Sequence, residues 1–155
     1  MKRLAILVAA LVTLLPAYAK GPKKGTDIIY LYTKASTVEE AYDIAMRAML
    51  EKGLPIITET PKYNTAKFGP FYAKMSKGIN HNVKLYLNIY CMERKNNIVV
   101  RGTGTYSSSL DNHRSEEVIS KIGMKGSIAD QTWNTLLETV RSIPHVYEEY
   151  ESSGY

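Results

Sequence analysis

A chain of 155 residues has the length of a single domain and is long enough to bury a core without disulfide or metal support. Its one cysteine, Cys91, excludes an internal disulfide. The formal net charge of +5 comes from five basic residues before Thr26, and the rest of the chain carries 15 basic and 15 acidic residues, which excludes a domain that is basic throughout.

The first 19 residues have the three-part layout of a secretory signal peptide. Two basic residues precede the apolar run Leu4–Leu15, which is followed by Pro16 and the small-residue pattern Ala17-Tyr18-Ala19. The run has twelve residues, whereas a membrane span needs about 20. We predict cleavage between Ala19 and Lys20 and a periplasmic or secreted protein with no transmembrane segment in the mature chain. The alternative is an uncleaved N-terminal anchor, whereas a lipid anchor requires a cysteine where Lys20 stands.

Residues 20–25 are rich in lysine, glycine and proline, and they predict a flexible basic tail ahead of a single domain over 26–155. The domain begins with a predicted strand over 27–33 that is rich in isoleucine and tyrosine.

A helix over 37–52 is predicted next, because apolar side chains recur there at helical spacing. We expect a capping box between Ser36 and Glu39 at its start. Gly53 provides a C-terminal cap, and Pro55 prevents continuation of the helix.

Four antiparallel strands are predicted over 56–60, 65–75, 82–93 and 98–106. The third alternates most regularly, with an apolar side formed by Val83, Leu85, Leu87, Ile89 and Cys91. Since strand side chains alternate between faces, this pattern indicates a half-buried strand. A polar turn over 94–97 joins it to the last strand, where Ile98 and Val100 point inward. The glycines within residues 101–105 predict a bulge or bend.

The segment 115–121 is a candidate for a short helical turn. A second amphipathic helix is predicted to begin near Ser127 and to end before Pro144. Its apolar face holds Ala129, Trp133, Leu136, Leu137, Val140 and Ile143. The predicted fold is therefore α+β in the order β-α-β-β-β-β-α, a curved antiparallel sheet with two helices packed on one face.

This layout resembles small exported bacterial domains of unknown function. The resemblance is carried by the Ala/Met-rich first helix before Gly53-Leu54-Pro55-Ile56 and by the late helix of Trp133 that ends in Ile143-Pro144. The folds of those domains are compared with the TATA-binding-protein-like fold or with the repeated domain of an outer-membrane assembly lipoprotein. The resemblance implies a fold and assigns no functional residue.

Residues of catalytic type do not form a recognisable motif. The three histidines, His81, His113 and His145, lack metal-ligand spacing. Ser109, Asp111 and His113 alternate within one loop, whereas a hydrolase triad draws its members from separate elements. Cys91 falls on the apolar side of its strand, where a thiol packs as a small hydrophobe. We therefore expect no cofactor, no metal and no catalysis.

The polar side of the same strand is the candidate binding surface. Lys84, Tyr86 and Tyr90 share it with Asn88, and Arg101 is expected beside them on the next strand together with Thr103 and Thr105. Both helices are committed to the apolar face, so we expect this other face to lie open. Its simplest interpretation is a solvated sheet face in which tyrosine serves strand propensity.

Charge indicates what such a surface would bind. Eight basic residues and one acid, Glu93, lie between Thr60 and Thr105, whereas eight acids and four bases follow from Asp111 onward. We propose as a hypothesis that Lys84, Tyr86, Tyr90 and Arg101 bind an anionic partner, an envelope glycan, lipid head group or protein. Export argues against nucleic acid. The alternatives are an inhibitor or immunity-type protein that blocks another protein, and an enzyme of an unrecognised kind.

Overall fold

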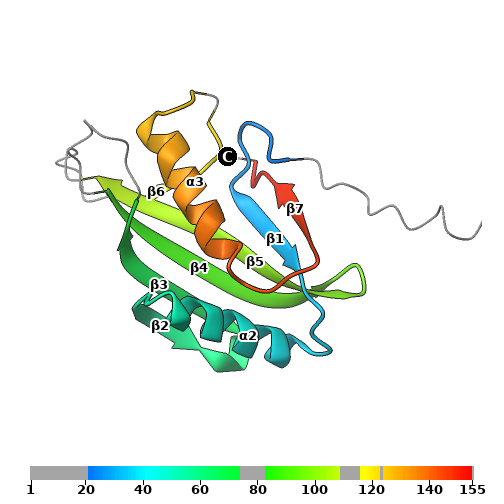
Figure 1. The fold of residues 1–155 in the computed structure, drawn as a ribbon. Coiled ribbons are helices and arrows are strands. Elements are labelled where there is room, and N and C mark those ends of the chain that lie inside the picture. The colour runs from blue at the N-terminus through cyan, green and yellow to red at the C-terminus, as the bar shows by residue number, and fades with distance from the viewer. Residues whose placement is uncertain (1–20, 74–82, 109–115, 123, 155) are drawn as a thin grey trace, which may run out of the picture.

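The computed structural model of the chain describes residues 21–73, 83–108, 116–122 and 124–154 (Figure 1). This part of the chain forms an α+β fold. Its elements are β1 (Ile28–Tyr32), α2 (Val38–Glu51), β2 (Ile56–Thr60), η1 (Pro61–Tyr63), β3 (Thr65–Tyr72), β4 (Val83–Arg94), β5 (Asn97–Ser108), β6 (Glu117–Val118), α3 (Ile128–Val140) and β7 (Tyr147–Glu151). The predicted signal peptide and its cleavage site at Ala19 and Lys20 lie outside the described residues.

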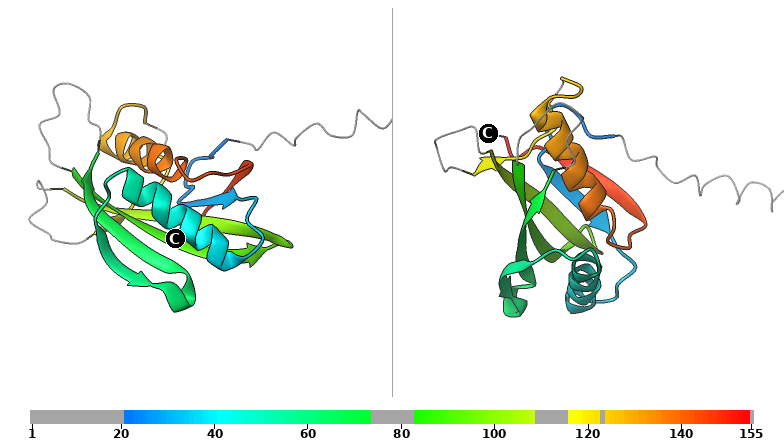
Figure 2. Two further views of the ribbon diagram at one scale, coloured as in Figure 1. Left: turned by 60° about the horizontal axis from the view of Figure 1, so that its bottom comes forward. Right: turned by 60° about the vertical axis from the view of Figure 1, so that its left-hand side comes forward.

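The strands form one open antiparallel sheet in the order β2-β3-β4-β5-β1-β7, with β6 paired to β5. Figure 2 shows that this sheet is strongly twisted and curved. The long hairpin of β4 and β5 closes where Arg94 pairs with Asn97. Between them Lys95 and Asn96 have φ of 50° and 58°, as a two-residue hairpin turn requires. The predicted polar turn is thus confirmed.

Two strands were not predicted, so the order β-α-β-β-β-β-α is incomplete. Strand β7 follows the second helix and pairs with β1 along its whole length, from Ile28 with Glu151 to Tyr32 with Tyr147. Its five residues are three glutamates and two tyrosines, a composition that hides strand periodicity. Strand β6 replaces the helical turn suggested for 115–121, because Glu117 and Val118 pair with β5.

Helix α2 confirms the predicted helix, although its cap is shifted by one residue. Thr37, rather than Ser36, is the N-cap, and its hydroxyl accepts a hydrogen bond from the backbone N–H of Glu40 at 3.1 Å. The Glu40 carboxylate in turn accepts one from the backbone N–H of Ser36 at 2.7 Å. After the helix, Gly53 has a φ of 73°, which explains why glycine ends it.

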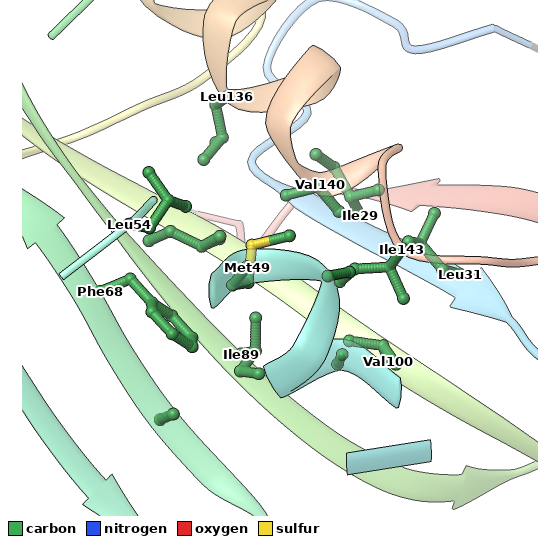
Figure 3. Packing of buried hydrophobic residues seen from close by; sticks show 14 of the residues in the cluster. Ile29, Leu31, Met49, Leu54, Phe68, Ile89, Val100, Leu136, Val140 and Ile143 are labelled. Carbon is green, nitrogen blue, oxygen red and sulfur yellow. The ribbon is translucent and has the colours of Figure 1, made fainter. Parts of the chain in front are cut away.

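Side chains of both helices meet side chains of β1, β3, β4 and β5 in one hydrophobic cluster, part of which is drawn in Figure 3. The cluster includes every residue of the predicted apolar side of β4, so that alternation is confirmed. Two strand glycines allow α3 to approach β5 closely. A Cβ at Gly102 would lie 3.1 Å from Val140, and one at Gly104 would lie 2.7 Å from Leu136. The pairing of β4 with β5 runs through both glycines without a register shift, so they mark no bulge, and their lack of a side chain serves close packing.

Strand β1 is buried along its whole length because both of its faces are covered. Ile29 and Leu31 belong to the main cluster. A second cluster on the opposite face holds Ile28, Tyr30, Tyr32 and Val99, with Met92 packed against them. We call this opposite side, which also bears Tyr90 and Arg101, the outer face of the sheet.

Candidate functional site

The outer face carries a hollow of about 380 Å³. It is lined by Thr58, Thr60, Thr65, Ala66, Lys67, Asn88, Ile89, Tyr90, Arg101 and Thr103. Ile89 and Ala66 are 1% and 6% exposed and belong to the main core, so they form only its floor. The remaining eight residues lie on β2, β3, β4 and β5.

Strand pairing arranges these eight side chains in two rows across the sheet, because directly paired residues of antiparallel strands share a face. The first row is Thr60, Thr65, Tyr90 and Arg101, and the second is Thr58, Lys67, Asn88 and Thr103. With strands about 4.8 Å apart, each row spans about 14 Å from β2 to β5. The hollow is therefore elongated across the strands.

Arg101 and Tyr90 form one end of the first row, where they stand directly opposite each other on β5 and β4. Tyr90 is 40% exposed, and Arg101 is half-buried. Within the described part of the chain, the Arg101 side chain makes no ion pair, hydrogen bond or ring contact. The ten lining residues include two charged side chains, Lys67 and Arg101, and both are positive.

Lys67 differs from Arg101 because its charge is balanced inside the protein. Its Nζ lies 3.1 Å from a carboxylate oxygen of Glu116 and 5.0 Å from the ring centre of Tyr86. The hydroxyl of Thr105 also donates to Glu116, at 2.6 Å. The hydrogen bond from Thr105, and then the interactions with Lys67, hold the pKa of Glu116 below its usual value. Of the two cations that line the hollow, Arg101 is therefore the one without a counter-charge in the described part of the chain.

The structure brings together two of the four predicted site residues, Tyr90 and Arg101. Tyr86 lies beyond the hollow, on the far side of Lys67, about 13 Å along the strand from Tyr90. Lys84 is about 20 Å from Tyr90 on the same strand, where it is exposed and pairs with Tyr72 and Ser107. All four share the outer face, but they do not form one compact patch.

The expectation that the whole outer face lies open is wrong at the β1 end. There the guanidinium of Arg94 covers the ring of Tyr30 at 4.0 Å from its centre. Arg94 forms ion pairs with Glu149 and Glu151 of β7, and the hydroxyl of Tyr32 donates to Glu149 at 2.8 Å. Burial, and then the hydrogen bond to Glu149, raise the pKa of Tyr32 to about 12. This end of the face is closed by the protein's own side chains.

Groups of catalytic type lie elsewhere. Burial raises the pKa of the Cys91 thiol to about 12, which suppresses the reactive thiolate. Both ring nitrogens of His145 are engaged, at 2.7 Å from the carbonyl oxygen of Ile143 and 3.1 Å from Glu148. Ser109, Asp111, His81 and His113 lie outside the described residues. In the described ranges, no group of three or more histidine, cysteine, aspartate or glutamate side chains is placed to hold a metal ion.

The lining groups are suited to binding. Threonine hydroxyls and the Asn88 amide both donate and accept hydrogen bonds, Tyr90 presents an exposed ring, and Arg101 offers a fork of donors to an anion. Among the lining side chains there is no carboxylate, histidine or thiol that would exchange protons near neutral pH.

Lys67 and the three threonines of β2 and β3 were not predicted as site residues. The spacing of Thr58 and Thr60, and of Thr65 and Lys67, predicts that the two residues of each pair lie on the same side of their strand. Their position opposite Asn88 and Tyr90 depends on the pairing of β3 with β4. Asn88 and Thr103 were assigned to this face but not to the site.

No protein-family model matches the chain, and no curated protein matches it. No helix in the described segments combines the length and the apolar character needed to cross a membrane.

Proposed function

We propose that this protein is an exported, non-catalytic binding module of the bacterial envelope that captures an anionic ligand in the hollow around Arg101. The observation that carries the proposal is the guanidinium of Arg101, which has no partner among the described residues and is half-buried in a hollow whose ten lining residues include no acid. Holding a cation partly out of water costs free energy unless an anion approaches it. Arg94, which lies on the same face, has two such anions already, Glu149 and Glu151.

The proposal takes both helices to lie on the face opposite the hollow. Its support is that residues of α2 and α3 share one hydrophobic cluster with Ile89 and Val100, the strand neighbours of Tyr90 and Arg101.

Export rests on the signal-like layout of residues 1–19. N-terminal sequencing of the protein from its native host tests it, with Lys20 as the expected first residue. A retained Met1 would contradict export.

Retention on immobilised polyphosphate tests anion binding. We expect the folded protein to be retained at low salt and released as salt rises. Arg101→Ala should weaken binding about tenfold, the effect of losing one charge-assisted hydrogen-bonded contact. The matched control is Lys52→Ala, which removes one positive charge from an exposed residue at the end of α2. Equal effects of the two variants would mean that net charge alone drives retention and would overturn the proposal.

A further inference from the structure

We infer that the anionic ligand is an acidic polysaccharide, which lies across strands β2 to β5 with one carboxylate on Arg101 and one sugar ring on Tyr90. This inference rests on the proposed function, because it names the ligand class of the same hollow. Three features of the lining carry it: its hydroxyl groups, the position of Tyr90 and the direction of the hollow.

Hydroxyl and amide groups dominate the polar lining. Four threonines and Asn88 surround the two cations in the two rows. Each of these groups can donate and accept, which matches the hydroxyls of a sugar, themselves both donors and acceptors. A ligand whose groups only accept hydrogen bonds, such as a phosphate chain, would leave the acceptor capacity of these threonines and of Asn88 unused.

Tyr90 places an exposed aromatic ring beside the free guanidinium. Its direct strand partner is Arg101, so the two residues stand side by side on adjacent strands whose backbones are about 5 Å apart. A tyrosine ring offers a flat apolar surface that a pyranose ring can cover, and its hydroxyl stays available at the rim. Arg101 can hold the carboxylate of a uronic acid bidentately at that position.

The direction of the hollow favours a chain over a surface. The rows run about 14 Å across four strands, and their floor is the backbone around Ala66 and Ile89. A bilayer surface would meet the eight lining side chains before it reached this floor. A protein partner would use an apolar centre to its interface, whereas the aliphatic side chains of the lining are at most 6% exposed.

Isothermal titration with oligogalacturonate, a uronic-acid oligomer, tests the inference. We expect the wild-type protein to bind it at least about tenfold more tightly than a neutral maltodextrin of the same length, because the neutral chain leaves Arg101 unpaired. Tyr90→Ala should weaken binding about tenfold, whereas Tyr90→Phe keeps the ring and should stay within about twofold. The matched control is Tyr72→Ala, which removes an exposed tyrosine that does not line the hollow.

Phosphatidylglycerol vesicles and polyglutamate serve as the competing anions. Binding of either one as tightly as oligogalacturonate would overturn the inference, as would unchanged binding by Tyr90→Ala or no binding of oligogalacturonate. Each of these results leaves the proposed function standing if retention on polyphosphate still depends on Arg101. If Arg101→Ala changed neither the retention on polyphosphate nor the binding of any other anion tested, the proposed function itself would be overturned.

Discussion

The guanidinium carbon of Arg94 lies 4.0 Å from the centre of the Tyr30 ring, so Arg94 is held against the sheet while Arg101, on the same face, makes no such contact among the described residues. Both arginines stand on the central hairpin of β4 and β5. The difference arises from β7, whose Glu149 and Glu151 reach Arg94. One arginine therefore fastens the C-terminal strand to the sheet, and the other is available to a ligand.

Replacing the two arginines should separate these roles. Arg94→Ala removes the ion pairs with Glu149 and Glu151 and the hydrogen bond to the Tyr32 hydroxyl, and we expect it to lower the free energy of unfolding by about 2 kcal/mol. Arg101→Ala removes a side chain that has no partner among the residues the structure describes, and it should stay within about 0.5 kcal/mol of the wild type. Urea denaturation measures both. A larger loss from Arg101→Ala than from Arg94→Ala would contradict the assignment.

Acid should weaken the attachment of β7. The pKa of Glu149 is lowered first by the hydrogen bond from Tyr32 and further by Lys95 and Arg94. Because the folded pKa lies below the unfolded value of about 4.3, this stabilisation is fully present above that value and is lost as pH falls through the folded pKa. The free energy of unfolding of Glu149→Gln should therefore fall less than that of the wild type as the pH is lowered from about 5 to about 2.

The control for this prediction is Glu51→Gln, at the exposed end of α2, where the structure describes no ion pair or hydrogen bond for the side chain. Its urea midpoint should follow that of the wild type across the acid range. If Glu149→Gln and the wild type lose stability in parallel, the carboxylate of Glu149 does not hold β7 in place.

Adding a side chain at Gly104 should destabilise the protein. A Cβ at this position would lie 2.7 Å from a methyl carbon of Leu136 and 3.0 Å from Ile119, and both of those side chains are fully buried. Gly104→Ala should therefore cost about 1–3 kcal/mol of unfolding free energy through overpacking. Gly21→Ala is the control, because no described atom beyond its chain neighbours lies within 4 Å of its added Cβ. Equal midpoints for the two variants in thermal or urea unfolding would show that α3 does not approach β5 this closely.

Cys91 should react slowly with a thiol reagent in the native protein and quickly after denaturation. The side chain is 1% exposed, and burial raises its pKa to about 12. Cys91→Ser should cost about 1–3 kcal/mol, since it buries a hydroxyl among apolar groups. Rapid labelling of the folded protein would place Cys91 on the outer face. That result would also turn Tyr90 and Arg101 into the core, because a shift of one residue exchanges the two faces of a strand.

Local patterns in the sequence were sufficient to predict the two helices, the strand β4 and the face on which Tyr90 stands. Each depends on the spacing of side chains within one segment, as in the alternation from Val83 to Cys91. The capping residue was misplaced by one position because Ser36 and Thr37 both suit an N-cap, and each is followed three residues later by a glutamate.

Relations between distant segments were beyond those patterns. Strand β7 forms because β1 presents it with a free edge, although its own composition does not predict a strand. Separation along the chain also made the count of charges within residues 60–105 misleading. Lys67 and Arg94 looked unopposed within residues 60–105, but Glu116, Glu149 and Glu151 from the C-terminal part neutralise them. Of the two basic residues that line the hollow, Arg101 is the one that no described acid opposes, as the count of charges had indicated.

Amide chemical-shift mapping with short-chain polyphosphate tests most directly whether the hollow around Arg101 is the anion-binding site. We expect the largest shifts at the amides of Tyr90, Arg101 and Thr103, with smaller ones at Thr65 and Lys67, and we expect Arg101→Ala to suppress them. Increasing salt should reduce the shifts, because the attraction is electrostatic. Shifts confined to the basic residues ahead of β1, or a pattern unchanged in Arg101→Ala, would contradict the account.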